Sequence, residues 1–316
     1  MLFRARTRPV YDAVSEVRNM KKALILINAY MQLESQFSQA ERIKTELENL
    51  GVQTQIRRND GFFACIQNSE IYSALPKEYD FCVYLDKDKY MSEMLERTGL
   101  RLFNRHSAIR DCDDKMQTYL ALAGAGIATP KTLAGLLCYS PDEKVNEASV
   151  IRVEEEIGYP VIVKESFGSL GKGVYMAQNR AELLGIMEKL KCRPHLFQRA
   201  VKASLGRDIR VIVIGGKAFS AMERKSETDF RSNIELGGVG TPFPLNEKLT
   251  DICEKTAKRL GLDYCGIDIL IDEDGTPLLC EVNSNAFFGG LERVTGVNVA
   301  GAYARHIVEK IYGEKQ

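Results

Sequence analysis

The chain has 316 residues, and its 43 lysines and arginines balance 43 aspartates and glutamates. Apolar residues make up 45% and charged residues 27%, which is typical of a globular protein and excludes a disordered or collagen-like chain. Because the net charge is zero, the chain has no excess positive charge for binding a polyanion, and we expect no nucleic-acid partner. Apolar runs such as Ala23 to Ile27 are far shorter than the roughly 20 residues of a membrane span, so we expect no membrane association.

Eight cysteines are scattered along the chain, and no two stand close enough in the sequence to indicate a zinc knuckle or a redox dithiol. Several, such as Cys82, lie within apolar strand patterns typical of buried, reduced thiols. We therefore predict a reducing, cytoplasmic location. Residues 1–19 contain no continuous apolar segment and do not predict a secretory signal, so we expect a disordered leader and favour Met20 as the native start.

Apolar, strand-like segments alternate with helical patterns through the first third of the chain. The expected strands cover residues 21–27, 52–57 and 79–85, and the expected helices cover residues 38–50 and 89–97. This alternation predicts a small α/β domain with a mainly parallel sheet. We assign it to residues 20–105.

The remainder of the chain begins with a helix and then changes character. Asp113 or Asp114 is expected to cap a helix that runs through Ala123. From Tyr159 onward, strands, glycine-rich loops and hairpin turns follow, closed by a helix near the C-terminus, which predicts an α+β region. We divide this part into a central subdomain and a C-terminal subdomain, which cover residues 106–195 and 196–316.

A strand that ends in Lys164 is followed by a loop with three glycines and then by another strand. Glycines let backbone N–H groups approach an anion closely, and a lysine adds a point charge at the same place. The spacing does not match a P-loop, G-x-x-x-x-G-K-[ST]. The loop therefore indicates either a phosphate-binding lid or an ordinary mobile turn. Its glycines are Gly168, Gly171 and Gly173.

A second motif lies in a predicted hairpin. If Asp274-Gly275 is a two-residue turn, Asp268 and Glu281 lie opposite each other, and Asn283 lies on the same face. Two carboxylates and an amide oxygen are suitable ligands for Mg²⁺. The alternative is a solvated polar face neutralised by a nearby lysine or arginine, and a slip in register would also separate the three side chains.

Between these motifs, two apolar strands carry arginines at their ends. Arg207 and Arg210 lie on the first strand and Arg224 on the second, with Arg231 shortly after it. Arginines in such clusters bind phosphates or carboxylates through paired hydrogen bonds, although exposed surface charge gives the same pattern.

The order of these motifs strongly resembles the ATP-grasp ligases, and among them the RimK-type glutamate ligases. The resemblance covers about residues 20–311 and rests on several separated motifs. These are Asp114-Lys115, Pro160 to Lys164 with its glycine loop, Gly206 to Arg210, Glu223-Arg224, Asp229 to Asn233, Asp268, and Glu281 to Asn283. The resemblance implies an ATP-grasp fold behind an N-terminal parallel α/β domain.

The resemblance also implies roles for individual residues. Those that bind ATP phosphates or form the lid are Lys115, Lys164, Ser169, Gly171 and Gly173. Those of the adenine and ribose sites are Gln198, Arg199, Ala200, Val201 and Asp208. Those of the nucleotide and acyl-phosphate site are Arg231, Ser232 and Asn233. The catalytic cations are Lys164, Arg210, Arg224 and Arg231, and the Mg²⁺ ligands, which Mn²⁺ could share, are Asp268, Glu281 and Asn283.

Two departures from the family pattern bear on specificity. Arg199 and Ala200 stand where relatives commonly have glutamate and an aromatic residue, which bears on the adenine contacts. The segment 284–290 differs from the branch that modifies ribosomal protein and looks closer to relatives that add amino acids to small cofactors or metabolites.

The activity that the resemblance implies is ATP-dependent joining of a carboxylate and an amine through an acyl phosphate. The expected substrates are a small-molecule or peptide carboxylate and an amino-acid amine, glutamate among them, and a homo-oligomer is compatible with this family. Two alternatives stay open at this point: kinase-type phosphotransfer to a small metabolite, and a nucleotide-binding module without turnover.

Overall fold

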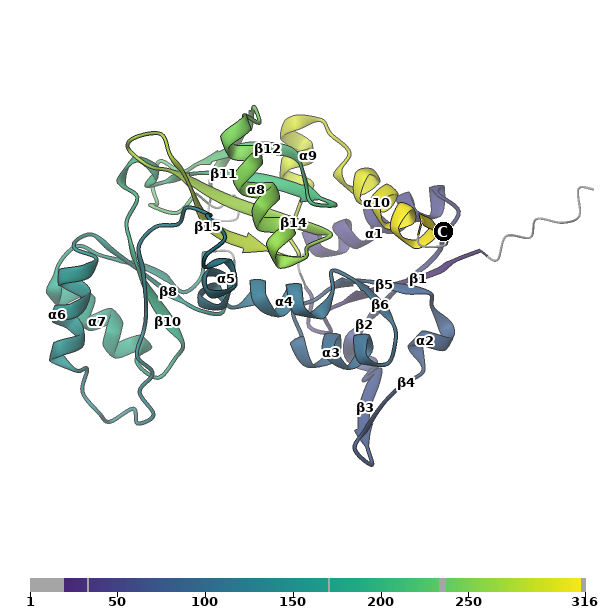
Figure 1. Ribbon diagram of the computed structural model, residues 1–316, viewed down its shortest axis with the longest axis horizontal. Helices are drawn as coiled ribbons and strands as arrows, with labels where there is room; N and C mark the ends of the chain where they lie inside the picture. The colour runs from purple at the N-terminus through teal and green to yellow at the C-terminus, as the bar shows by residue number, and fades with distance from the viewer. Residues whose placement is uncertain (1–19, 33, 170, 233–236, 314–316) are drawn as a thin grey trace, which may run out of the picture.

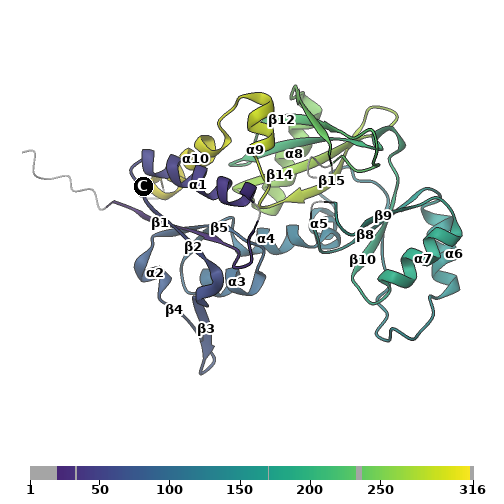
Figure 2. The same ribbon diagram turned by 180° about the vertical axis from the view of Figure 1, so that it is seen from behind.

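The computed structural model describes residues 20–32, 34–169, 171–232 and 237–313. The expected leader over residues 1–19 and the predicted site residue Asn233 lie outside this part of the chain. Among the described residues, three sheets of four or five strands and one two-stranded sheet are arranged along an elongated molecule (Figure 1). A small lobe with α6 (Glu147–Glu156) and α7 (Arg180–Leu190) stands at one end in both views (Figures 1 and 2).

The N-terminal sheet is parallel, as predicted, and has four strands in the order β2-β1-β5-β6, of which β6 was not predicted. Its strands are β1 (Lys22–Ile27), β2 (Gln53–Arg58), β5 (Phe81–Leu85) and β6 (Arg101–Phe103), and its helices include α1 (Glu34–Asn49) and α3 (Lys89–Arg97). The sequence patterns did not predict the short elements that lie between β2 and β5. These are η1 (Asn59–Gly61), β3 (Ala64–Gln67), β4 (Glu70–Ser73) and α2 (Leu75–Glu78).

Two helices connect this sheet to the rest of the molecule, α4 (His106–Asp113) and α5 (Lys115–Leu122). Asp114 separates them because its backbone is extended, and its carboxylate accepts the N–H groups of Met116 and Gln117. This is an N-cap, which satisfies amide groups that have no partner within the helix. Of the two caps considered, Asp114 is therefore the one used, and α4 is an additional helix.

The small lobe contains an antiparallel sheet in the order β7-β10-β8-β9. Its strands are β7 (Thr132–Ala134), β8 (Val161–Glu165), β9 (Val174–Ala177) and β10 (His195–Arg199), and its helices are α6 (Glu147–Glu156) and α7 (Arg180–Leu190). The lobe has a core of its own, in which Val163 and Phe197 pack with Val153 and Leu183 of the helices. β10 runs across residue 196, where the sequence analysis placed the start of the C-terminal subdomain.

The large sheet is antiparallel, in the order β13-β12-β11-β14-β15. Its strands are β11 (Arg207–Ile214), β12 (Lys217–Lys225), β13 (Val239–Phe243), β14 (Tyr264–Ile271) and β15 (Pro277–Asn283). The other elements of this region are η2 (Lys202–Ser204), α8 (Glu247–Leu260), α9 (Gly289–Thr295) and α10 (Val299–Gly313).

The alternation of side chains along β11 determines where the charged end of the large sheet lies. Ile209 and Val211 point to the face that packs with α8. On the other face, Ile212 packs in a core shared with the N-terminal sheet. Arg210 lies on the same face as Ile212 and is a buried charge. One face of the sheet is thus an apolar junction at one end and a polar site at the other.

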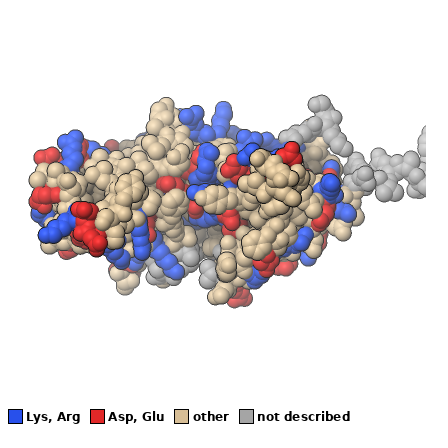
Figure 3. Space-filling view, turned by 90° about the horizontal axis from the view of Figure 1, so that it is seen from below, with Lys and Arg blue, Asp and Glu red and all other residues tan. Residues whose placement is uncertain are grey.

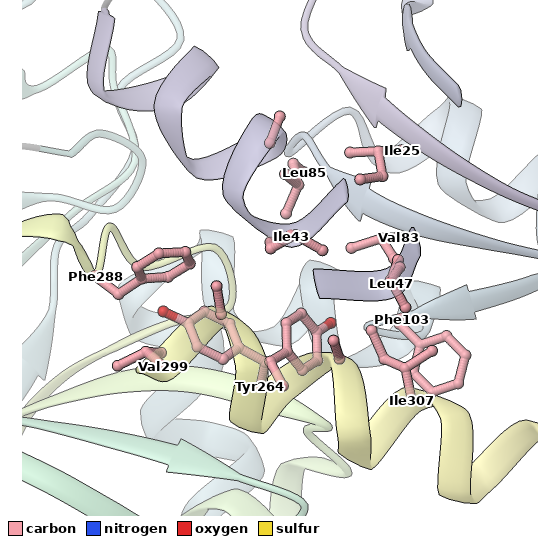
Figure 4. Packing of buried hydrophobic residues seen from close by; sticks show 14 of the residues in the cluster. Ile25, Ile43, Leu47, Val83, Leu85, Phe103, Tyr264, Phe288, Val299 and Ile307 are labelled. Carbon is pink, nitrogen blue, oxygen red and sulfur yellow. The ribbon is translucent and has the colours of Figure 1, made fainter. Parts of the chain in front are cut away.

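The shared core joins the two ends of the described chain. Figure 4 shows Ile25 and Val83 of the N-terminal sheet and Ile43 of α1 on one side, with Tyr264 of the large sheet and Ile307 of α10 on the other. All five side chains are buried. The N-terminal sheet is therefore held against the large sheet by apolar packing, while the small lobe has a separate core.

Asn104 links the N-terminal sheet to the large sheet through four hydrogen bonds. Its Nδ2 donates to the carbonyl oxygens of Tyr264 and Ser284 over 2.7 and 2.8 Å. Its Oδ1 accepts the N–H groups of Asp263 and Tyr264 over 2.7 and 3.0 Å. Every polar group of this buried amide thus has a partner in the other sheet.

Basic and acidic side chains are interspersed over the face seen in Figure 3. In the part of the chain that the structure describes, no helix has both the length and the apolar content needed to cross a bilayer.

Candidate active site

Charged side chains form a row across four strands of the large sheet. Asp208 on β11 lies directly opposite Arg224 on β12, and Arg210 on β11 lies directly opposite Asp268 on β14. Asp268 in turn lies opposite Glu281 on β15. The predicted register of the two carboxylates is therefore confirmed.

The prediction of a two-residue turn at Asp274-Gly275, on which that register rested, is wrong. The hairpin closes through a longer turn over residues 272–276, in which the Asp272 N–H donates to the Thr276 carbonyl oxygen over 2.9 Å. From this turn, Ile269 pairs with Leu279, and a register shift then lets Asp268 pair with Glu281. Cys280 is the extra residue of this bulge, and it restores the register that the shorter turn would have produced.

Asp268 is neutralised by two arginines. Arg210 binds both of its oxygens, with the Nη2–Oδ2 hydrogen bond at 2.7 Å, and Arg224 Nη2 lies 3.0 Å from Oδ2. Burial by itself raises the pKa of Asp268, but Arg210 and Arg224 outweigh it and hold the pKa below its ordinary value. The alternative of a solvated polar face neutralised by a lysine or arginine is thus met only in part, because arginines neutralise Asp268 but its carboxylate is buried.

The glycine-rich loop is held by two of the predicted phosphate-binding cations. Lys115 Nζ donates to the Gly168 carbonyl oxygen over 2.9 Å and lies 3.5 Å from Glu281 Oε1. Arg231 donates to the Gly171 carbonyl oxygen over 2.8 Å, while Asp229 holds the rest of its guanidinium. Carbonyl oxygens thus take the place on these cations that phosphate oxygens would take.

Lys164 is a buried cation without a carboxylate partner. Its side chain is 7% exposed, its Nζ donates to Cys280 Sγ over 3.5 Å, and among the described residues no carboxylate oxygen lies within 4.0 Å of it. Burial lowers the pKa of Lys164, but the surrounding Cys280, Tyr119 and Glu281 outweigh it, and the pKa lies above its ordinary value. Lys164 is therefore charged at neutral pH, and Glu281 is a nearby negative charge although no direct ion pair joins the two among the described residues.

A cavity of about 110 Å³ collects most of the predicted nucleotide-binding residues. The predicted residues that line it are Lys115, Lys164, Ser169, Gly171, Gln198, Arg199, Val201, Asp208, Arg224, Arg231, Ser232, Asp268 and Glu281. Gly173 and Ala200 are not among its lining residues. Its volume is below the about 300–1,000 Å³ of typical small-ligand sites, and the glycine-rich loop forms part of its wall.

Two of the lining side chains are occupied by protein partners. Gln198 Nε2 donates to Tyr119 Oη and Thr132 Oγ1, each over 2.9 Å. Arg199 pairs with Asp272 over 2.7 Å. The arginine that departs from the family pattern thus stabilises the turn of the β14–β15 hairpin.

A second, larger cavity of about 1,130 Å³ lies between the N-terminal sheet and the large sheet. Arg210, Asn283 and the segment 285–290 line it, and Glu281 and Arg224 line both cavities. The two cavities therefore meet at the row of charges. This arrangement allows two ligands to approach each other from opposite sides of Glu281 and Arg224.

The N-terminal sheet contributes a polar cluster to the larger cavity that the sequence analysis missed. Asn28 follows β1 and Asp86 follows β5, and Asn28 Nδ2 donates to Asp86 Oδ1 over 3.0 Å. Asn59, which follows β2, donates to the other oxygen. Ligands of open parallel sheets bind at the carboxyl ends of neighbouring strands where the strand order reverses, which here is between β1 and β5. The sequence does contain a signal for this cluster, because its polar residues stand just after strands that were predicted to be parallel.

The predicted metal ligands suit a hard cation. Asp268 accepts three hydrogen bonds, and because a carboxylate has about four lone-pair positions, one position on Oδ1 is left for a cation. Among the described residues no cluster of three His, Cys, Asp or Glu side chains could hold a metal, so a three-ligand site here requires the Asn283 amide oxygen. Two carboxylates and one amide match the oxygen preference of Mg²⁺.

Comparison with known proteins agrees with this geometry. Beta-citrylglutamate synthase B of Danio rerio is 38% identical over 229 residues, 72% of this chain and 55% of that protein. The ribosomal protein bS6–L-glutamate ligase of Escherichia fergusonii is 34% identical over 215 residues, 67% of this chain and 69% of that protein. The chain thus spans about half the length of the vertebrate relatives it matches.

Solved structures share the fold at lower identity. The D-alanine–D-alanine ligase of Bacillus anthracis, solved with ATP, aligns with a TM-score of 0.71 and 16% identity over 93% of this chain and 98% of that chain. The model of the RimK-like ATP-grasp domain matches residues 112–307, which include every predicted site residue. The chain belongs to the RimK-like ATP-grasp family.

Proposed function

We propose that this protein is an ATP- and Mg²⁺-dependent ligase that joins an amino acid, glutamate first among candidates, to a carboxylate acceptor. The observation that carries the proposal is Lys164, a buried cation with no carboxylate partner among the described residues, in a cavity that meets a second cavity at Glu281 and Arg224. The first cavity suits nucleotide phosphates and the second suits the molecules to be joined. The names of the two relatives described above, beta-citrylglutamate synthase B and ribosomal protein bS6–L-glutamate ligase, both refer to glutamate.

The reaction has two steps. A carboxylate oxygen of the acceptor attacks the γ-phosphorus of ATP, an O–P bond forms, and the bond to the β-phosphate oxygen breaks to release ADP. The amine nitrogen then attacks the carbonyl carbon of the acyl phosphate, a C–N bond forms, the C–O bond breaks, and phosphate leaves while the amine gives up a proton.

The side chains contribute position and charge rather than a nucleophile. Lys164 and Lys115 hold phosphate oxygens, and Arg231 moves from the Gly171 carbonyl to the γ-phosphate. Arg224 lies at the junction of the cavities, where it can hold the acceptor carboxylate beside the phosphate. The lid then excludes water, which would hydrolyse the acyl phosphate.

A divalent cation held by Asp268, Glu281 and Asn283 would neutralise charge on the phosphates. The two arginines on Asp268 fix the orientation of its carboxylate, and Lys115 does the same for Glu281. This chain therefore supplies both the ligands and the groups that orient them.

The acceptor is expected to be a small molecule. The segment 285–290 lines the larger cavity, together with Asp86 and Asn28 of the N-terminal sheet. This segment is the one that departs from the branch that modifies ribosomal protein, and its place in the cavity supports a role in acceptor choice. We place the activity in the cytoplasm, where ATP and reduced thiols are both present.

Release of ADP by the purified protein tests the proposal. Small carboxylates and amino acids are supplied singly and in pairs with ATP and Mg²⁺, and the products are identified by mass spectrometry. A ligase releases ADP and phosphate and forms an amide only when an amine is present. A stable phosphorylated carboxylate that accumulates equally with or without an amine would instead show a kinase, and no ADP release with any pair would contradict both activities.

A further inference from the structure

The fold brings together two cysteines that are far apart in the sequence. Cys138 lies in the loop between β7 and α6, and Cys192 lies in the turn between α7 and β10. The backbone N–H of Cys138 donates to the Lys191 carbonyl oxygen over 2.7 Å, which anchors the loop beside the turn. This backbone contact places Cys138 next to Cys192, and burial together with the neighbouring Cys138 raises the pKa of the Cys192 thiol. Spacing along the chain alone gave no indication of this pair, because 53 residues separate the two cysteines in the sequence.

Both thiols are accessible from solvent. Cys192 is exposed and Cys138 is half-buried, whereas Cys82, Cys112 and Cys253 are buried. The Cys138 thiol donates to the Ser140 carbonyl oxygen over 3.0 Å, a contact that holds the side chain in place. Solvent access and proximity both favour thiol–disulfide exchange, whose rate also depends on the fraction of each thiol that is ionised.

Cys138 lines an apolar groove on the outer face of the small lobe, and Lys191, next to Cys192, lines it too. The groove has a volume of about 560 Å³, and Phe197, Met187, Leu136 and Cys138 are among its lining residues. Along β10, Phe197 faces this groove and Gln198 faces the nucleotide cavity, because successive side chains of a strand point to opposite faces. The thiol pair is therefore on the side of the sheet away from the active site.

We propose that Cys138 and Cys192 form a reversible disulfide, a thiol-modification site separate from the proposed ligase site. With a small-molecule disulfide as oxidant, one protein thiolate attacks a sulfur of the oxidant, forms a mixed disulfide and releases one small thiol. The second protein thiolate then attacks the protein sulfur of the mixed disulfide, forms the Cys138–Cys192 bond and releases the second small thiol. The two protons lost by the protein end on the two released thiols.

The bond would tie the loop between β7 and α6 to the end of α7 and fix the wall of the groove. It would also close a ring of about 55 residues that contains α6, β8, β9 and α7. A cross-link across a ring of this length restricts the unfolded chain and so stabilises the folded lobe. We therefore expect oxidation to raise the midpoint of thermal unfolding by several degrees, and reduction by dithiothreitol to reverse the rise.

The test uses the full chain incubated with mixtures of reduced and oxidised glutathione, followed by peptide mass spectrometry without reduction. We expect one linked peptide pair, Cys138 with Cys192, and the loss of two of the eight thiols. Cys138→Ser and Cys192→Ser should abolish both the link and the thermal shift, and each should leave glutathione on the remaining cysteine. Cys65→Ser, which removes another exposed thiol, should change neither.

Three outcomes would overturn the proposal. They are glutathione retained on Cys192 of the parent protein without a link, a link between Cys192 and any other cysteine, and a linked protein whose thermal midpoint is unchanged. None of these readouts depends on ATP use, so they do not bear on the proposed ligase activity. The activity of the reduced serine variants should equal that of the reduced parent protein.

Discussion

Glu281 on β15 faces Asp268 on β14 because Cys280 forms a bulge in β15. This extra residue lies between Leu279, which pairs with Ile269, and Glu281. If the pairing near the turn continued without the bulge, Asp268 would face Cys280, and Glu281 would point to the opposite face. The bulge therefore brings the second carboxylate to the junction of the two cavities. It also brings the Cys280 sulfur to 3.5 Å from Lys164 Nζ.

Replacement of this carboxylate tests the metal assignment. Glu281→Gln keeps the size and burial of the side chain and removes its charge, so we expect an unchanged fold. ATP-dependent product formation should fall by about 100- to 1,000-fold, the usual cost of losing one electrostatic contact in a transition state. Binding of Mn²⁺ in the presence of ATP, followed by electron paramagnetic resonance, should weaken in parallel. Glu273→Gln, exposed in the turn of the same hairpin, is the control, and full activity of Glu281→Gln would refute the assignment.

Substitution of Lys164 separates binding from stability. Lys164→Met keeps the aliphatic length and removes a buried charge that has no carboxylate partner among the described residues. Because the surroundings of Lys164 favour its charge by more than burial opposes it, the free energy of unfolding should fall slightly. Affinity for ATP should fall by about 10- to 100-fold, since a hydrogen bond to a charged group is worth about 1.5–3 kcal/mol. Urea denaturation and calorimetric titration measure the two quantities.

Lys202→Met, at an exposed lysine, should alter neither quantity. A loss of stability in Lys164→Met with unchanged ATP affinity would show that this lysine is a structural residue.

Asn104→Ala should be strongly destabilising. The substitution removes four hydrogen bonds and leaves two carbonyl oxygens and two N–H groups without their partner in a buried position. At about 1 kcal/mol for each hydrogen bond, we expect a loss of about 4 kcal/mol, measured by urea denaturation. Asn104→Asp should cost at least as much at neutral pH, because a carboxylate would face the carbonyls of Tyr264 and Ser284. Gln67→Ala, at an exposed amide, should have little effect.

The ion pairs of Asp268 predict a dependence of stability on acid. The folded-state pKa of Asp268 lies below its ordinary value because Arg210 and Arg224 outweigh the effect of burial. The unfolded chain therefore binds this proton more readily, so the stabilisation is complete above about pH 5 and is lost as the pH falls through the folded-state pKa. Unfolding free energies measured from pH 6 to pH 3 should show this loss. Asp268→Asn should be less stable overall, and its free energy of unfolding should fall less between about pH 6 and pH 3. An equal fall in the variant and the parent protein would contradict the lowered pKa of Asp268.

Local patterns predicted the elements whose signal is local. The apolar run at residues 22–27 became β1, and the aspartate before Lys115 became the cap of α5, because burial periodicity and capping depend on neighbours in the sequence. The register of Asp268 with Glu281 was correct although the turn was wrong, since the bulge at Cys280 offsets the longer turn.

The features that the sequence did not reveal depend on contacts between distant segments. Asn104 is one polar residue among many until β6 is placed against the large sheet, and Cys138 meets Cys192 only after the small lobe has folded. The bidentate pair of Arg210 with Asp268 likewise depends on which strand lies next to β11. The periodicity of apolar residues does not show which distant segments lie next to each other, so the partners of charged residues could not be derived from it.

The packing of α10 against α1 has a consequence for synthesis of the protein. The apolar face of α1, with Ile43 and Leu47, is covered by α10 residues such as Ile307, which the ribosome adds about 260 residues later. At about 5–20 residues per second, the nascent N-terminal domain would display this face for about 13–52 seconds. The small lobe, whose core is complete once Phe197 has emerged, can fold in the meantime. The packing of the N-terminal domain is thus completed only after α10 has been made.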